Sequence, residues 1–245
     1  MQNPGIIPMI FALIILITGC ENDGSDIDSF SDTGKGGSLA RFTISGDHLY
    51  AVDNNALHTF NISNHQDPYF VSKKNVGFGV ETIFPRGEHL FLGTQFGMHI
   101  MDISSPANPE EISFFEHIYS CDPVVVDSQY AYITLSVESW CGRSTNELQI
   151  VNINNLKDPF LVSSYPMKKP KGLGIDSTTL FICDEGLKVF DISDVEHIKK
   201  TNQYDIDARD VIPYRGRLLV IGQEGIYQYA IQDKGLNLLS TIEVN

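Results

Sequence analysis

The feature that most constrains the fold of this chain is an internal repeat of about 40 residues, which begins near Ser38 and continues to residue 245. Five short apolar runs, HLYAVD, HLFLGT, YAYITL, TLFICD and LLVIGQ, are centred on Tyr50, Phe91, Tyr132, Phe181 and Val220, at spacings of 41, 41, 49 and 39 residues. A second run follows each of them, and Asn61, Asp102, Asn152, Asp191 and Ala230 hold the same place in it. Two landmarks that keep the same order and similar offsets indicate five copies of one structural unit.

Each unit is predicted to contain four short strands, which in the first unit cover 41–45, 49–53, 57–62 and 69–75. Three units carry a proline in the turn before the fourth strand (Pro68, Pro109 and Pro159), where it fixes φ and stops the third strand. Four strands in about 40 residues, repeated, are typical of propeller blades. We therefore predict an all-β fold, a five-bladed β-propeller of four-stranded blades, with repeats at approximately 38–78, 79–119, 120–168, 169–207 and 208–245. A β-sandwich is the alternative, although it would not need two landmarks at one period.

Residues 1–19 contain no ionisable side chain, and twelve apolar residues, Ile6–Ile17, dominate them. A helix needs about 20 residues to span a bilayer, so this segment matches the apolar core of a secretory signal. The residues Ile17-Thr18-Gly19-Cys20 resemble the lipobox of bacterial lipoproteins, which implies cleavage before Cys20 and lipid attachment to it. A plain cleaved signal with a chance cysteine is the alternative. Glu21 follows Cys20, and in that family the absence of Asp there favours the outer membrane over the inner one.

Residues 20–37 follow the predicted signal and form an acidic, glycine-rich segment with almost no apolar side chains, which predicts a flexible tether. The whole chain has 17 basic and 31 acidic side chains and a formal net charge of −14. This balance argues against nucleic acid as a partner, because a phosphate backbone favours clustered Lys and Arg. The expected partners are a lipid bilayer, through acylated Cys20, and an unidentified protein or glycan, and the chain is expected to be a monomer.

The repeats themselves resemble a known family. The segments GMHIMDIS, NELQIVNI and GLKVFDIS are similar to the core of the LVIVD repeat of bacterial surface proteins, and the stretch from Cys121 to Ser193 is the most similar. The last unit departs from the pattern, since Ala230 stands where Asp is usual. The resemblance implies a propeller at the cell surface, and it implies no particular activity or site residues.

Strand order decides which loops share one rim of a propeller. The links between units and the turns between second and third strands lie at the same rim, and loops on a rigid scaffold often carry function. Cys121 lies in such a link and Cys141 in the insertion 136–146, so a Cys121–Cys141 disulfide is predicted, with two unrelated thiols as the alternative. Trp140 and Arg143 of this insertion are ligand-binding candidates; otherwise Trp140 packs over the disulfide. Cys183, inside a predicted strand, is expected to be a buried apolar side chain.

Five positions at the start of the first strands are predicted to encircle the mouth of the central channel: Ala40, Glu81, Asp122, Lys171 and Asp210. The four charged residues are candidates for ligand binding. Their carboxylates can serve as an acid and base pair for glycoside hydrolysis or as hard oxygen ligands for a metal. The interpretation we favour is that Lys171 and Arg209 neutralise these carboxylates.

The predicted function is therefore a membrane-anchored binding or interaction module at the surface or in the periplasm. A carbohydrate-active enzyme that uses Glu81, Asp122 and Asp210 is the alternative. The seven histidines never fall at zinc-ligand spacing, and the sequence contains no nucleophile elbow, phosphate loop or dinucleotide motif. No metal or cofactor is predicted, and an enzymatic activity is disfavoured.

Overall fold

The computed structural model describes residues 36–117, 123–136, 146–232 and 235–244. All described residues belong to one compact unit, Ser31–Asn245. These residues form β-strands joined by turns, which confirms the all-β prediction. In this part of the chain, no helix has the length and apolar character needed to cross a membrane.

The strands form five antiparallel sheets of four strands, each in the order of the chain. The first sheet contains β1 (Phe42–Ser45), β2 (His48–Val52), β3 (Ala56–Asn61) and β4 (Tyr69–Asn75), and the second β5 (Val80–Arg86), β6 (His89–Thr94), β7 (Gly97–Asp102) and β8 (Glu110–Glu116). The third contains β9 (Val124–Val126), β10 (Tyr130–Leu135), β11 (Glu147–Asn152) and β12 (Phe160–Pro166). The fourth contains β13 (Pro170–Asp176), β14 (Thr179–Asp184), β15 (Leu187–Asp191) and β16 (Lys199–Tyr204). The fifth contains β17 (Ala208–Tyr214), β18 (Arg217–Gly222), β19 (Gly225–Gln232) and β20 (Gly235–Glu243).

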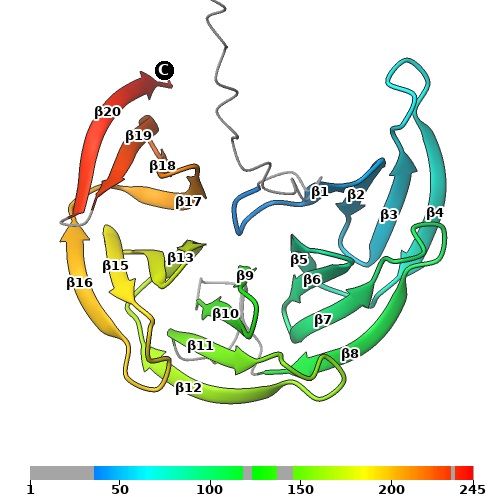
Figure 1. The fold of residues 1–245 in the computed structure, drawn as a ribbon, viewed down its shortest axis with the longest axis horizontal. Coiled ribbons are helices and arrows are strands. Elements are labelled where there is room, and N and C mark those ends of the chain that lie inside the picture. Colours follow the sequence, from blue (N-terminus) through cyan, green and yellow to red (C-terminus); the bar gives the residue numbers. More distant parts are fainter. Residues whose placement is uncertain (1–35, 118–122, 137–145, 233–234, 245) are drawn as a thin grey trace, which may run out of the picture. The chain divides into compact units, whose positions relative to one another are not determined.

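The five sheets follow one another around a common centre, with the first strand of each sheet innermost and the fourth outermost (Figure 1). The first strands of consecutive sheets lie side by side. This arrangement is the five-bladed propeller that the repeat predicts. We call the side that carries the links between sheets and the turns between second and third strands the link rim.

Local sequence explains why the strands end where they do. Gly46 and Gly87 occupy the turns between the first and second strands of their sheets, and both have positive φ, which costs glycine no steric strain. Pro68, Pro109 and Pro159 each directly precede a fourth strand. The strand bounds expected for the first unit agree with β1 to β4 to within one residue at each end.

One sequence-based alignment needs correction, and it concerns the fifth unit. In the first and fourth sheets, the central residue of the second strand pairs with the residue of the first strand that lies seven positions earlier in the chain. Tyr50 pairs with Thr43, and Phe181 pairs with Gly174. In the fifth sheet the residue that pairs in this way is Leu219, opposite Ile212. The equivalent of Tyr50 is therefore Leu219 and not Val220. A slip of one residue exchanges the two faces of a strand, so it also changes which residue of this unit reaches the channel.

Apolar clusters fill the spaces between consecutive sheets. Four clusters of buried side chains join the first sheet to the second, the second to the third, the third to the fourth and the fourth to the fifth. One position of the first strand illustrates the pattern, since Ile83, Val124, Leu173 and Val211 are all buried there. The same position in the first sheet is Phe42, whose exposed fraction is 63%. The described residues contain no comparable cluster between the fifth sheet and the first.

Cys183 lies within the cluster between the fourth and fifth sheets and is fully buried as a free thiol. Burial raises the pKa of this thiol, so it remains protonated and is a poor nucleophile. The prediction that Cys183 is a core side chain is confirmed.

Candidate functional site

The innermost strands of three sheets have a β-bulge where they begin at the link rim. The pairing register shifts between Val80 and Thr82, between Pro170 and Leu173, and between Ala208 and Asp210. The residues skipped by these shifts include Glu81, Lys171 and Arg209. A bulge re-aims side chains relative to a regular strand, and these three residues line the same cavity.

The cavity has a volume of about 590 Å³ and opens among the starts of the innermost strands. Its described lining includes four charged residues, Arg41, Glu81, Lys171 and Arg209, each from a different sheet or the segment leading into it. Apolar surface is supplied by Leu39, Val80, Pro123 and Pro170. The cavity is therefore formed by the convergence of sheets that are far apart in sequence.

The charged lining residues contact mostly neutral groups. Arg41 donates to the backbone carbonyl of Val80 at 3.3 Å, and Arg209 donates to Oε1 of Gln223 at 3.1 Å. The Glu81 carboxylate accepts a hydrogen bond from the Gln95 amide at 2.9 Å. Lys171 is the exception, because its Nζ lies 4.0 Å from an Asp207 carboxylate oxygen, and both side chains are substantially exposed.

Asp210 does not belong to this lining, which corrects the sequence-based prediction. The position equivalent to Glu81 and Lys171 in the fifth sheet is Arg209, as the corrected register requires. Asp210 is buried, and its carboxylate accepts hydrogen bonds from Ser38 Oγ at 2.9 Å and from the Leu39 N–H at 3.2 Å. Burial raises the pKa of this carboxyl, while these hydrogen bonds and one from the Val211 N–H oppose the rise.

The Asp210 carboxylate joins three parts of the chain. Ser38, which donates to it, also accepts a hydrogen bond from the Leu173 N–H at 2.8 Å, so the segment before β1 is linked to both β13 and β17. Gly37 and Gly172 lie against the carboxylate, and a Cβ at either position would overlap it. Asp210 is thus a structural residue of the link rim.

The three carboxylates of the alternative enzyme hypothesis do not all meet at the cavity. Glu81 lines it, Asp210 does not, and Asp122 lies outside the described residues. Among the described residues, no group of three or more His, Cys, Asp or Glu side chains is arranged to hold a metal ion. Five further candidates also lie outside the described residues and stay predictions: Cys20, Cys121, Cys141, Trp140 and Arg143.

The LVIVD repeat matches residues 36–75 and 86–116, which cover most of the first two sheets. Together with the five four-stranded sheets, this match decides the class of the protein. The chain is a β-propeller that contains LVIVD repeats. No curated protein sequence matches it.

Solved structures support the same fold for this LVIVD propeller. A protein from Lactobacillus plantarum has a TM-score of 0.62 and 12% identity over 80% of this chain and 67% of its own. AztD from Citrobacter koseri has a TM-score of 0.58 and 11% identity over 82% of this chain and 63% of its own. A protein of unknown function from Desulfotomaculum acetoxidans has a TM-score of 0.61 and 12% identity over 87% of this chain and 70% of its own. The chain thus spans about two thirds of the length of these structures, and identities this low show the fold alone.

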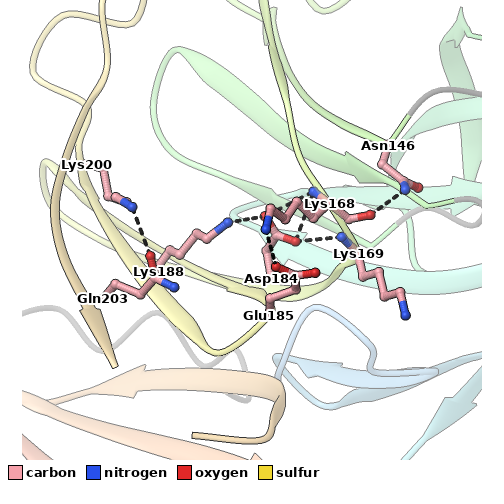
Figure 2. A network of polar contacts seen from close by, with 8 residues as sticks. All are labelled: Asn146, Lys168, Lys169, Asp184, Glu185, Lys188, Lys200 and Gln203. Carbon is pink, nitrogen blue, oxygen red and sulfur yellow. Dashed lines mark hydrogen bonds and ion pairs between the residues drawn. The ribbon is translucent and has the colours of Figure 1, made fainter. Parts of the chain in front are cut away.

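A second polar network at the link rim of the LVIVD propeller positions the strand that carries Lys171. The Asp184 side chain, at the end of β14, is fully buried. It accepts hydrogen bonds from the backbone N–H groups of Lys168 and Lys169 and from the Lys188 ammonium (Figure 2). Burial raises the pKa of Asp184, but these three donors outweigh it and lower the pKa below its ordinary value. The link into β13 is therefore held by a charged, buried acceptor.

Sequence reasoning found two cavity residues and missed two. Glu81 and Lys171 follow the repeat period, and both line the cavity. Arg209 was missed because the fifth unit was aligned one residue out of register. Arg41 was missed because it follows Ala40, the predicted position, and strict alternation would direct the two side chains to opposite faces. Alignment of the hairpin Tyr214–Arg217 with Ser45–His48 would have identified Arg209.

Proposed function

We propose that this LVIVD propeller is a lipid-anchored binding module of the cell envelope, which takes its ligand at the cavity of the link rim. The observation that supports this most is the cavity itself. Its volume of about 590 Å³ lies within the usual range of small-molecule sites, and it combines apolar surface with a few convergent polar groups.

The scaffold around the cavity suits binding. The innermost strands pack through buried apolar clusters, so the side chains at their ends are presented on rigid elements. Carboxylate-based hydrolysis would need two carboxylates about 5–9.5 Å apart at one site. Of the described candidates, only Glu81 lines the cavity, and its carboxylate is engaged by Gln95. This favours binding over hydrolysis.

A substitution that fills the cavity tests the binding site. Asn54 lines the cavity from the exposed turn between β2 and β3, and its backbone carbonyl, which accepts from the Gly79 N–H, is retained in any substitution. We expect full-length Asn54→Trp to lose at least ten-fold in affinity for any ligand found by a glycan and metabolite screen. His65→Trp, in an exposed turn at the opposite rim, is the matched control and should bind like the wild type. Equal binding by both variants would refute the cavity as the site, and turnover of chromogenic glycosides would refute a pure binding role.

The anchor is tested separately, because it rests on Cys20 and the preceding residues alone. Cells that express the wild type should incorporate labelled palmitate into this protein, and Cys20→Ser should abolish the incorporation. Label that persists in Cys20→Ser would show that the chain is not acylated at this residue.

A further inference from the structure

The described lining of the cavity carries a charge opposite to that of the chain. The protein has a formal net charge of −14, yet the described lining contains three cationic side chains, Arg41, Lys171 and Arg209, and one carboxylate, Glu81. A cleft with an excess of one sign of charge concentrates ions of the other sign. On an acidic protein, such a site favours small anions, because the rest of the surface repels a large polyanion.

Among the residues that the structure describes, the contacts of these side chains leave most of the positive charge uncompensated. The partners of Arg41 and Arg209, a backbone carbonyl and an amide oxygen, carry no net charge. Lys171 and Asp207 are 4.0 Å apart with exposed side-chain fractions of 40% and 56%, and an exposed pair at this separation contributes little. The one carboxylate of the described lining, Glu81, accepts a hydrogen bond from the Gln95 amide at 2.9 Å.

The cations come from different parts of the fold. Arg41 precedes β1 of the first sheet, Lys171 lies in β13 of the fourth, and Arg209 lies in β17 of the fifth. Bulges at the start of β13 and β17 bring Lys171 and Arg209 to the cavity. Guanidinium groups bind carboxylates and phosphates through paired hydrogen bonds, while an ammonium adds a point charge.

We propose that this cavity binds a small organic anion that carries carboxylate or phosphate groups, with Arg41, Lys171 and Arg209 as the anion contacts. The proposal rests on the proposed function and specifies the chemistry of its ligand. The volume of about 590 Å³ admits a molecule of ordinary metabolite size.

Calorimetric titration of the full-length protein tests the proposal with four probes: citrate, glucose 6-phosphate, inorganic phosphate and, as the neutral counterpart, glucose. We expect citrate or glucose 6-phosphate to bind and glucose not to bind. Binding of citrate alone would assign carboxylate, and binding of both phosphates alone would assign phosphate. The Kd should increase with ionic strength, because screening weakens charge attraction.

The double variant Arg41→Gln with Arg209→Gln should raise the Kd for the anion at least about ten-fold, since each charged hydrogen bond is worth roughly one order of magnitude. Arg217→Gln removes one positive charge at the other end of the fifth sheet and should change the Kd less than about two-fold. Arg41 and Arg209 are exposed, so the melting temperature of the double variant should match the wild type. The salt dependence of the wild type gives an independent measure that needs no variant.

The outcomes separate the two proposals. A neutral ligand whose binding is lost in Asn54→Trp but kept in the arginine double variant would overturn the anion proposal and leave the binding module standing. Anion binding that is unchanged in the double variant, or equal in Arg217→Gln and the double variant, would also overturn it. Absence of binding by every probe would overturn the anion proposal, and absence of any ligand in the wider screen would overturn both.

Discussion

The junctions between consecutive sheets and the junction between the fifth and first sheets use different interactions. Between consecutive sheets, buried side chains such as Ile83, Val124 and Leu173 form continuous apolar clusters. Between the fifth sheet and the start of the first, the described contact is polar and depends on Ser38 and Asp210. Phe42 and Leu173 have the same register in their sheets, yet Leu173 is buried and Phe42 is largely exposed. Whether a repeat position is buried therefore depends on the sheet that packs against it.

The difference between the two kinds of junction predicts its largest effect on stability for two truncations at equivalent positions, Leu173→Ala and Phe42→Ala. Leu173→Ala should lower the free energy of unfolding by about 3 kcal/mol, because it leaves a cavity between the third and fourth sheets. Phe42→Ala removes a larger side chain from the equivalent position but should cost less than about 1 kcal/mol, since that side chain is 63% exposed. Chemical denaturation measures both. Equal losses would mean that Phe42 is covered in solution, and the contrast between junctions would fail.

A somewhat smaller effect is expected at the buried network that supports the fourth sheet. Asp184→Asn removes the charge that accepts from the Lys188 ammonium and from two backbone N–H groups. We expect a loss of about 2 kcal/mol, the usual value of a hydrogen bond to a charged group, and a melting temperature lower by several degrees. Asp158→Asn, at an exposed turn, is the control. An unchanged melting temperature for Asp184→Asn would show that the network adds nothing to stability.

The polar junction itself should respond to the loss of one hydroxyl group. Ser38→Ala deletes a donor to Asp210 and an acceptor for the Leu173 N–H, both at buried sites. We expect a loss of about 1.5 kcal/mol, measured against Ser240→Ala, whose exposed hydroxyl donates to Gln228. If the two variants unfold at the same denaturant concentration, Ser38 does not secure this junction.

The smallest effect is a pH dependence that has opposite signs at the two buried aspartates. Because burial raises the pKa of Asp210, the folded state holds its proton more tightly than the unfolded state does. Its ionisation therefore lowers stability as pH rises from the ordinary value of 3.8 to the raised pKa, and acidification through this window removes the cost. Asp184, whose pKa is lowered, behaves in the opposite way and loses its stabilisation as pH falls below 3.8 towards its folded pKa.

Asp210→Asn isolates the first of these two effects, because the amide does not titrate. The difference in melting temperature, wild type minus Asp210→Asn, should become more positive as pH falls from 7 towards 4. Thermal unfolding followed by circular dichroism gives this difference at each pH. A constant difference, or one that becomes more negative, would contradict a raised pKa at Asp210.

Much of the fold follows from the sequence because each sheet is a local unit. The turn prolines and the alternating apolar runs determine strand order and bounds within 40 residues, and both are visible without knowledge of other units. The fifth unit was misaligned because Leu218, Leu219 and Val220 are successive aliphatic residues, so the centre of the run is ambiguous. The pairing of β17 with β18 decides which residue of this run is equivalent to Tyr50, and apolar character alone does not reveal that pairing.

The site was less predictable than the fold. Glu81 and Lys171 follow the period of the repeat, but a bulge adds a residue to one strand and so interrupts the alternation on which predictions of side-chain direction depend. The partner of Asp210 lies 172 residues away, at Ser38, and no local pattern marks such a pair. A charged residue at a periodic position therefore indicates the mouth of the channel, whereas its contacts there depend on tertiary structure.

The construction of every sheet from four consecutive strands has a consequence for how the chain folds. Each recorded strand pairing joins neighbours along the chain, so the loops that must close during sheet formation are short and their entropic cost is small. A sheet can therefore form as soon as its own 40 residues are available, and the next sheet can add to its exposed face. The contact between Ser38 and Asp210 must wait until residues 172 positions apart have both been placed. We expect it to be the last of these contacts to form and the first to open, which makes this junction the kinetic weak point of the ring.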